Sequence, residues 1–225
     1  MSDLTLNEAL TIIGGFSNTD KMPWLSWSVS AFDCQVGSKL REIPGSTCSN
    51  CYALKFRYTF PAVQGAQRKR MAALDDPRFE AAFIFALDFH HQRTRRTRLV
   101  NGETIRENRF RLYDSGDLQS LDNLEMWNRI ALALPKIEMW LPTREVEYVR
   151  QFKAVHSEGF AKNLIVRIST PMQGDRFRNR PMGLPFSTVD RTDPDIKACP
   201  ASNQGNKCLD CSTCWSQANV SYASH

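Results

Sequence analysis

The sequence predicts an α/β protein, built as a partial (β/α) barrel or a parallel sheet with an irregular cysteine-rich C-terminal appendage. Strand-like and helix-like segments alternate between residues 24 and 168. Seven cysteines gather at two places, and the chain from residue 171 onward holds five prolines and little periodicity. Strands that alternate with helices of this length pair in parallel through right-handed crossovers. We therefore expect an α/β body over residues 1–170 and a metal-binding region over 171–225 that packs on it.

Residue spacing defines the elements in the first half of the body. A short helix is expected over 6–13, and the aromatic, β-branched and serine residues of 24–30 predict a strand. The segment 52–74 is helical in composition and is broken at Pro61. A further helix begins at Asp76-Pro77, because proline suits the first turn and the following apolar residues recur at helical spacing.

The second half of the body repeats strand and helix. Ser120 is a plausible cap for an amphipathic helix that Pro135 ends, because serine accepts a backbone N–H at a helix start and proline cannot continue a helix. The expected elements are strands over 109–113, 137–141 and 164–168 and helices over 121–134 and 145–156.

Composition narrows the class of protein. The chain has 225 residues and a formal net charge of +5, and a chain of this length buries a core without help from disulfides or metal. No run approaches the roughly 18 apolar residues that a membrane helix needs, and the first ten residues lack the features of a signal peptide. We therefore expect a cytoplasmic protein with no membrane partner, in which clustered cysteines bind metal or a redox centre rather than form disulfides.

The C-terminal cysteines form the strongest motif. A Cys-Pro pair and seven further residues precede three cysteines spaced two residues apart, with Trp215 directly after the last. Closely successive thiolates can reach separate corners of a [4Fe-4S] cluster. Four cysteines around a structural zinc ion are the alternative. The tail cysteines are Cys199, Cys208, Cys211 and Cys214.

Three further cysteines follow the first predicted strand. Thirteen residues separate Cys34 from Cys48, and Cys51 comes next, directly before Tyr52. Three thiolates satisfy three corners of a cluster and leave one iron open to an outside ligand. Alternatively, these early cysteines form part of a structural site. We call Cys34, Cys48 and Cys51 the early group.

The early group resembles the cysteine triplet of radical S-adenosylmethionine enzymes. In that superfamily the triplet holds a cluster whose free iron chelates the cofactor, and a segment after the second strand contacts the cofactor's amino group. The resemblance implies S-adenosylmethionine as a cofactor, with Ser115, Gly116 and Asp117 as that segment. The gap after Cys34 is longer than in the superfamily, and Asn50 stands where an aromatic residue usually precedes the last cysteine.

A second resemblance covers most of the chain. Phage proteins of the gene-product-eighty-eight type are similar in the segments 48–53, 113–117 and 139–144 and in a terminal Cys-Pro followed by a cysteine run and an aromatic residue. This resemblance implies an iron-sulfur phage protein in the host cytoplasm. It leaves open a radical S-adenosylmethionine-like enzyme, a non-catalytic electron-transfer or redox-sensing protein, and a zinc-stabilised nucleic-acid-binding module.

Basic residues are concentrated over 55–111, where 13 Lys or Arg face 6 Asp or Glu. Such a patch can contact the phosphates of nucleic acid, or it can simply complement the dipole at a helix end. The arginines that crowd this helix end are Arg93, Arg95, Arg96 and Arg98.

Strand ends also carry ligand-binding candidates. Loops that leave parallel strands open at one edge of a sheet, so Asp117 and Arg144 are expected near the early group. They could bind the ammonium and carboxylate groups of an unidentified small molecule. A helix-starting exposed aspartate and a salt-bridged surface arginine are the alternatives. The same reasoning predicts that the early and tail cysteines serve one face of the molecule, in one shared centre or two neighbouring ones.

Overall fold

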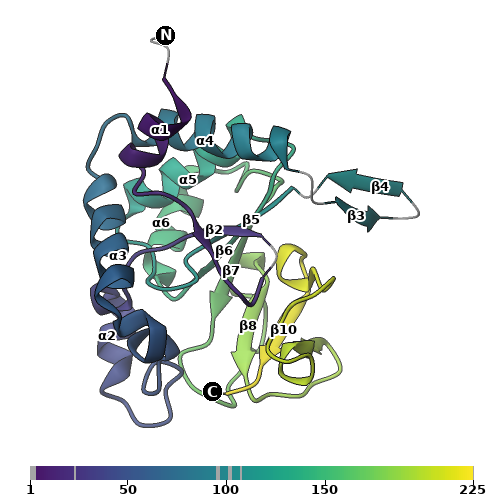
Figure 1. Cartoon of the computed structure of the whole chain (residues 1–225). Helices are drawn as coiled ribbons and strands as arrows, with labels where there is room; N and C mark the ends of the chain where they lie inside the picture. The colour runs from purple at the N-terminus through teal and green to yellow at the C-terminus, as the bar shows by residue number, and fades with distance from the viewer. Residues whose placement is uncertain (1–3, 23, 95–96, 101–102, 107, 225) are drawn as a thin grey trace.

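The chain forms a mixed α/β structure around one eight-stranded sheet (Figure 1). In a computed structural model, residues 4–22, 24–94, 97–100, 103–106 and 108–224 are described. Every neighbouring pair of strands in this sheet is parallel except β1 and β2. In spatial order the strands are β1 (Ser17–Asn18), β2 (Leu25–Trp27), β5 (Arg109–Leu112), β6 (Glu138–Thr143), β7 (Leu164–Ser169), β8 (Phe186–Val189), β10 (Asn219–Tyr222) and β9 (Ile196–Ala198).

The other expected helices are present, but the part of the 52–74 segment before Pro61 forms two short 3-10 helices, η2 (Tyr52–Leu54) and η3 (Phe56–Thr59). Thr5 and Glu8 form a capping box at the start of α1, and the Ser120 hydroxyl accepts the Asn123 N–H at 3.1 Å at the start of α5. The structure adds α2 and a separate hairpin of β3 (Thr97–Val100) and β4 (Glu103–Arg106), which the sequence analysis did not predict. The helices are α1 (Leu6–Ile12), α2 (Gln35–Arg41), α3 (Pro61–Ala73), α4 (Phe79–Arg93), α5 (Leu121–Ala133) and α6 (Val146–Val155).

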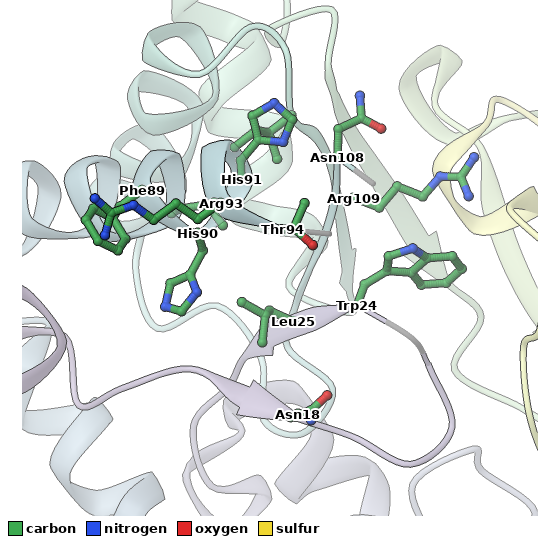
Figure 2. A pocket seen from close by; sticks show the side chains of 12 residues that line it. Asn18, Trp24, Leu25, Phe89, His90, His91, Arg93, Thr94, Asn108 and Arg109 are labelled. Carbon is green, nitrogen blue, oxygen red and sulfur yellow. The ribbon is translucent and has the colours of Figure 1, made fainter. Parts of the chain in front are cut away.

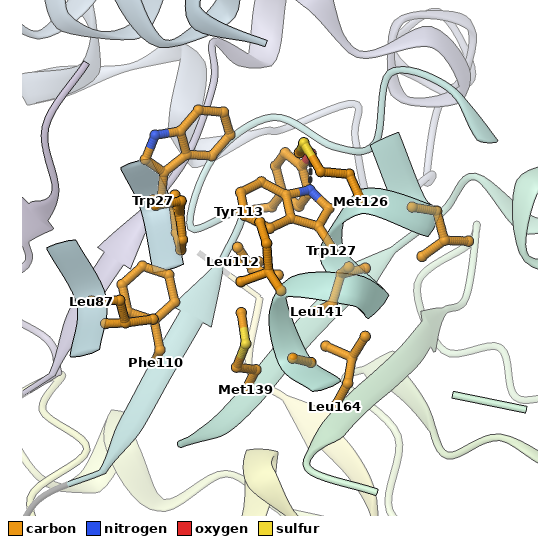
Figure 3. Packing of buried hydrophobic residues seen from close by; sticks show 14 of the residues in the cluster. Trp27, Leu87, Phe110, Leu112, Tyr113, Met126, Trp127, Met139, Leu141 and Leu164 are labelled. Carbon is orange, nitrogen blue, oxygen red and sulfur yellow. Dashed lines mark hydrogen bonds between the residues drawn. The ribbon is translucent and has the colours of Figure 1, made fainter. Parts of the chain in front are cut away.

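One face of the sheet packs against helices α1, α4, α5 and α6. Successive residues of a strand point to opposite faces, so Phe110 and Leu112 of β5 enter this core while Arg111 points away. Two fully buried tryptophans lie at its centre, Trp27 and Trp127 (Figure 3), with ring centroids 5.3 Å apart. Their N–H groups donate to the Ile13 carbonyl and the Tyr113 hydroxyl, so the core buries large aromatic area without leaving these donors unpaired.

The opposite face of the sheet is covered by the C-terminal segment. A smaller cluster of Met22, Trp24, Trp140 and Trp215 packs there. Trp215 contacts both other tryptophans, with centroids 4.5 Å from Trp24 and 5.2 Å from Trp140. The chain on both sides of the tail cysteines is therefore tied to the sheet.

The C-terminal part of the chain is more regular than the sequence predicts. Strands β8, β9 and β10 all lie within 171–225, and each joins the main sheet. With three or four residues each, they are too short to show hydrophobic periodicity. Within the described residues β1 and β9 end the strand order and do not pair with each other. None of the helices described has the length and apolar character needed to cross a bilayer.

Candidate metal centres

The structure brings the early group together at the carboxyl end of β2. Cys34 directly precedes α2, and the loop carrying Cys48 is held by a hydrogen bond from Thr47 N–H to the Pro171 carbonyl at 2.8 Å. Gly37 lies close to two of the sulfur atoms. A Cβ at this glycine would lie 3.0 Å from Cys34 Cβ, 3.5 Å from Cys34 Sγ and 3.6 Å from Cys48 Sγ, so the glycine leaves space beside both sulfurs.

Electrostatics in the early group favour protonated thiols. Burial raises the pKa of Cys34, and the charges of Asp117, Cys51 and Cys48 raise it further, whereas Arg144 opposes them. Burial also raises the pKa of Cys48. The charge of Arg144 works against this increase, and the charge of Cys51 adds to it. Three crowded thiols ionise together only if positive charge compensates them, and a bound metal supplies such charge.

Asp117 is buried and fully engaged in hydrogen bonds, so the alternative of an exposed helix-starting aspartate is wrong. Its Oδ1 accepts from the Thr143 hydroxyl at 2.6 Å and from Leu118 N–H at 2.8 Å, and its Oδ2 accepts from Arg144 N–H at 2.8 Å. The carboxylate thus joins the ends of β5 and β6 beneath the early group.

Ser115 and Gly116 pack against the chain that follows β2. The Ser115 hydroxyl donates to the Val29 carbonyl at 2.7 Å and accepts from Gln67 Nε2 at 2.8 Å. Gly116 has φ +73°, and a Cβ there would lie only 2.5 Å from Val29 Cγ2. The residues expected to contact a cofactor therefore also hold two strand ends together.

Arg144 lies beside the early group rather than in a surface salt bridge. Its Nε donates to the Thr47 hydroxyl at 3.0 Å, and its charge acts on Cys34, Cys48 and Asp117. The neighbouring Glu145 is buried and accepts Val36 N–H at 2.9 Å at the start of α2. Sequence reasoning missed Glu145, because its partner helix was not predicted.

The tail cysteines approach one another from separate chain segments. Cys199 extends the pairing of β9 and β10 through its N–H to the Ser221 carbonyl at 2.7 Å, and Cys208 N–H donates to the Lys21 carbonyl at 2.8 Å. Burial, with Cys214 and Cys199, raises the pKa of Cys208 to about 11. Cys211 lies on the same turn, with its N–H on the Cys208 carbonyl at 2.9 Å.

Arg167, in the middle of β7, holds the tail turn. It is fully buried, and its guanidinium donates to backbone carbonyls on both sides of the tail cysteines. No carboxylate pairs with it among the described residues, so carbonyl dipoles solvate its charge. The carbonyls belong to Phe186, Thr213, Cys214, Ser216 and Ala218.

Arg111 interacts electrostatically with Tyr52 and with the tail cysteines Cys208 and Cys214. Burial alone would lower its pKa, but Tyr52, Asp114 and Tyr222 outweigh burial and raise it. Tyr52 directly follows Cys51, and the Tyr222 hydroxyl is 3.3 Å from Cys214 Sγ. Arg111 therefore interacts with the residue that follows the early group and with a residue that contacts a tail cysteine.

Several buried N–H donors around the tail cysteines have no acceptor. They are the Nε atoms of Arg111 and Arg167 and the indole Nε1 atoms of Trp24 and Trp140. The Arg111 guanidinium carbon also lies 4.5 Å from the Trp140 ring centre. Sequence reasoning missed both arginines, although Arg167 is the one charged residue of an otherwise largely apolar strand, which is an unusual position.

No group of three or more His, Cys, Asp or Glu side chains in the described part of the chain is arranged to hold a metal ion. A single zinc ion needs its thiolates about 2.3 Å away, converging on one point. The four irons of a cubane cluster hold their thiolates farther apart than a single ion does. The cysteine arrangement therefore speaks against a single-ion site more strongly than against a cluster.

A cavity of about 250 Å³ lies apart from both groups, between the end of α4 and the starts of β2 and β5. Figure 2 shows its two arginines directed away from His90: Arg93 lies over Phe89, 3.8 Å from the ring centre, and Arg109 extends past Trp24. Of the other arginines in the basic patch, Arg95 and Arg96, and the side chain of Arg98, lie outside the described residues.

Comparison with known proteins identifies a family. No curated protein and no solved structure matched the chain. A family model described as gene product 88 matches residues 31–217, a range that contains all seven cysteines. Because the match covers most of the chain, the protein belongs to the gene product 88 family, as its resemblance to phage gene-product-eighty-eight-type proteins predicted.

Proposed function

We propose that this protein is an iron-sulfur protein whose tail cysteines bind a [4Fe-4S] cluster. One observation carries the proposal: thiols from two chain segments, Cys199 and residues 208–214, act on one another electrostatically beside buried N–H donors that lack acceptors. Cys199, Cys208 and Cys214 act on one another electrostatically, and Arg111 acts on the last two. Thiolates and bridging sulfides accept such N–H groups, and hydrogen bonds to sulfur are a known means of tuning a cluster.

The surrounding residues have definite tasks in this proposal. Arg167 fixes the carbonyls of the turn and thereby positions Cys214. Trp215, only 8% exposed, keeps water from one side of the tail cysteines. Arg111 supplies positive charge against the thiolates. A bound cluster would supply one-electron transfer, and the chain would control its potential through charge, hydrogen bonds and solvent exclusion.

The early group supports a second candidate, an S-adenosylmethionine-dependent enzyme of radical type. Three thiols gather at a strand end beside Arg144, which could bind the carboxylate of a small ligand. Both carboxylate oxygens of Asp117 already accept hydrogen bonds from the protein, so an ammonium group could bind there only by replacing one of these donors. An electron-transfer or sensing protein remains the non-catalytic alternative.

The deciding experiment counts iron, acid-labile sulfide and zinc in anaerobically purified protein. The wild-type protein is expected to contain about four irons and four sulfides for each occupied group. The double variant Cys199→Ser with Cys214→Ser should lose the tail cluster, whereas Cys34→Ser with Cys48→Ser should lose only iron bound at the early group. Ser212→Ala, between the tail cysteines, is the matched control and should keep full iron content.

Each outcome separates the candidates. One equivalent of zinc without sulfide would replace the cluster by a structural zinc site. Iron that responds spectroscopically to S-adenosylmethionine, and loses that response in the early double variant, would support the enzyme. Iron that is reduced and oxidised without any such response would support the redox protein.

A further inference from the structure

The surface around the early group is rich in exposed aromatic side chains. Phe56 is 80% exposed, Phe60 is 56% exposed and Phe32 is 54% exposed. Among the large hydrophobic side chains that are exposed in the described chain, five of nine lie between residues 32 and 60. Such a concentration on one stretch indicates a binding surface rather than scattered exposure.

These aromatics are carried by three short helices in contact with one another. The 3-10 helix η1 (Ala31–Asp33) contacts η2 (Tyr52–Leu54), η2 contacts η3 (Phe56–Thr59), and η3 leads into α3. α2 and α3 flank this region at the lower left of Figure 1. Phe32, Phe56 and Phe60 are therefore exposed on neighbouring parts of the chain, which we call the aromatic surface.

The backbone at Phe56 is strained. Its φ is +51°, in the left-handed region that disfavours any residue with a Cβ. Burial cannot offset this strain, because the side chain is the most exposed of the large hydrophobics. A strained residue that presents its ring to solvent suits a role in binding.

The chain that carries Phe56 and Phe60 is strongly basic, whereas the exposed Asp33 stands next to Phe32. Between Ile43 and Leu74 there are five Lys or Arg and no Asp or Glu. Lys55, Arg57, Arg68 and Lys69 are exposed. Arg57 is paired with Asp20 across an exposed bridge of 2.7 Å, and a bridge between two such exposed side chains is weak enough for another anion to displace.

We infer that the aromatic surface binds single-stranded nucleic acid, with unpaired bases stacked on the phenylalanines and phosphates held by the basic side chains. Exposed rings in a positively charged setting are the usual means of binding single strands without sequence preference. Bases within a duplex are already stacked and offer no free faces to such rings.

The surface borders the early group. Phe32 lies two residues before Cys34, and Tyr52 directly follows Cys51. A stacked base would therefore lie beside these cysteines, and a nucleic-acid base becomes the substrate class of the early site. That last step rests on the proposed function, whereas binding itself does not.

The test is fluorescence anisotropy with labelled single-stranded DNA and RNA of about 15 nucleotides, measured over a range of salt concentrations. Phe56→Ala should weaken binding about tenfold, since one lost base stack is worth about that factor. Lys55→Glu with Arg57→Glu should weaken binding further and reduce the salt dependence by one to two phosphate contacts. Phe85→Ala and Lys136→Glu, which alter exposed residues elsewhere, are the controls.

Several results would overturn the inference. They are no binding by the wild-type protein, equal losses in the controls, or unchanged binding in all surface variants. If Arg93→Glu abolished binding and Phe56→Ala did not, the nucleic acid would bind at the arginines near the end of α4 instead. Binding to anionic lipid vesicles in place of oligonucleotides would make the surface a membrane contact. Metal content is measured on the same samples, so iron-free protein that still binds would refute the cluster proposal and retain this one.

Discussion

Replacing Gly116 by alanine tests how the two strand ends beneath the early group are joined. Gly116 has φ +73°, and its missing Cβ would lie 2.5 Å from Val29 Cγ2 and 2.8 Å from the Val29 carbonyl oxygen. Val29 is fully buried, and a β-branched side chain has few rotamers into which it can withdraw. Neither the side chain nor the carbonyl group of Val29 can move away from the added Cβ without a shift of the backbone after β2.

Two costs add in this variant. The left-handed conformation costs a residue with a Cβ about 1–2 kcal/mol, and forcing a methyl group into a packed site costs about 1–3 kcal/mol. The free energy of unfolding should therefore fall by about 2–5 kcal/mol for Gly116→Ala. Gly159 is the matched control, because it has φ +78° and no atom within 4 Å of the added Cβ. Only the first cost applies there.

Urea unfolding followed by tryptophan fluorescence measures both variants. Gly116→Ala should be less stable than Gly159→Ala by about 1–3 kcal/mol, the cost of overpacking alone. Equal stabilities would show that the close approach to Val29 does not exist and that both losses come from backbone conformation.

Three further changes probe other parts of the molecule. Gly37→Ala should leave the stability of the metal-free protein nearly unchanged but lower iron content at the early group, because the methyl group enters the space between two sulfurs. Arg167→Leu should cost at least about 3 kcal/mol of unfolding free energy, since it leaves buried carbonyls unpaired, and limited proteolysis should then cut the tail. Burial lowers the pKa of His90 from its ordinary 6.5. His90 therefore binds a proton more tightly in the unfolded chain, and the free energy of unfolding should fall as the pH drops below about 6.5. In urea titrations above and below this pH, His90→Phe should show a smaller fall than the wild-type protein.

Local sequence determined the elements that have enough residues to show a period. The helix after Ser120 begins and ends within a residue or two of its predicted limits because its cap, apolar stripe and terminal proline agree. Strands β5, β6 and β7 were likewise predicted, since β5 alternates apolar and charged residues and β6 and β7 each contain a run of at least three apolar residues. The shared strand edge that gathers Cys34, Asp117 and Arg144 follows from parallel topology alone.

Only the tertiary structure decided how the C-terminal chain is used. Strands β8, β9 and β10 gain their stability from pairing with β7 and with each other rather than from their own composition, so no local pattern revealed them. The same holds for Arg111 and Arg167, whose positions depend on which sheet face the tail covers. Side-chain identity and spacing therefore predicted that the cysteines bind metal, while long-range pairing brought Arg111 of β5 close to the tail cysteines.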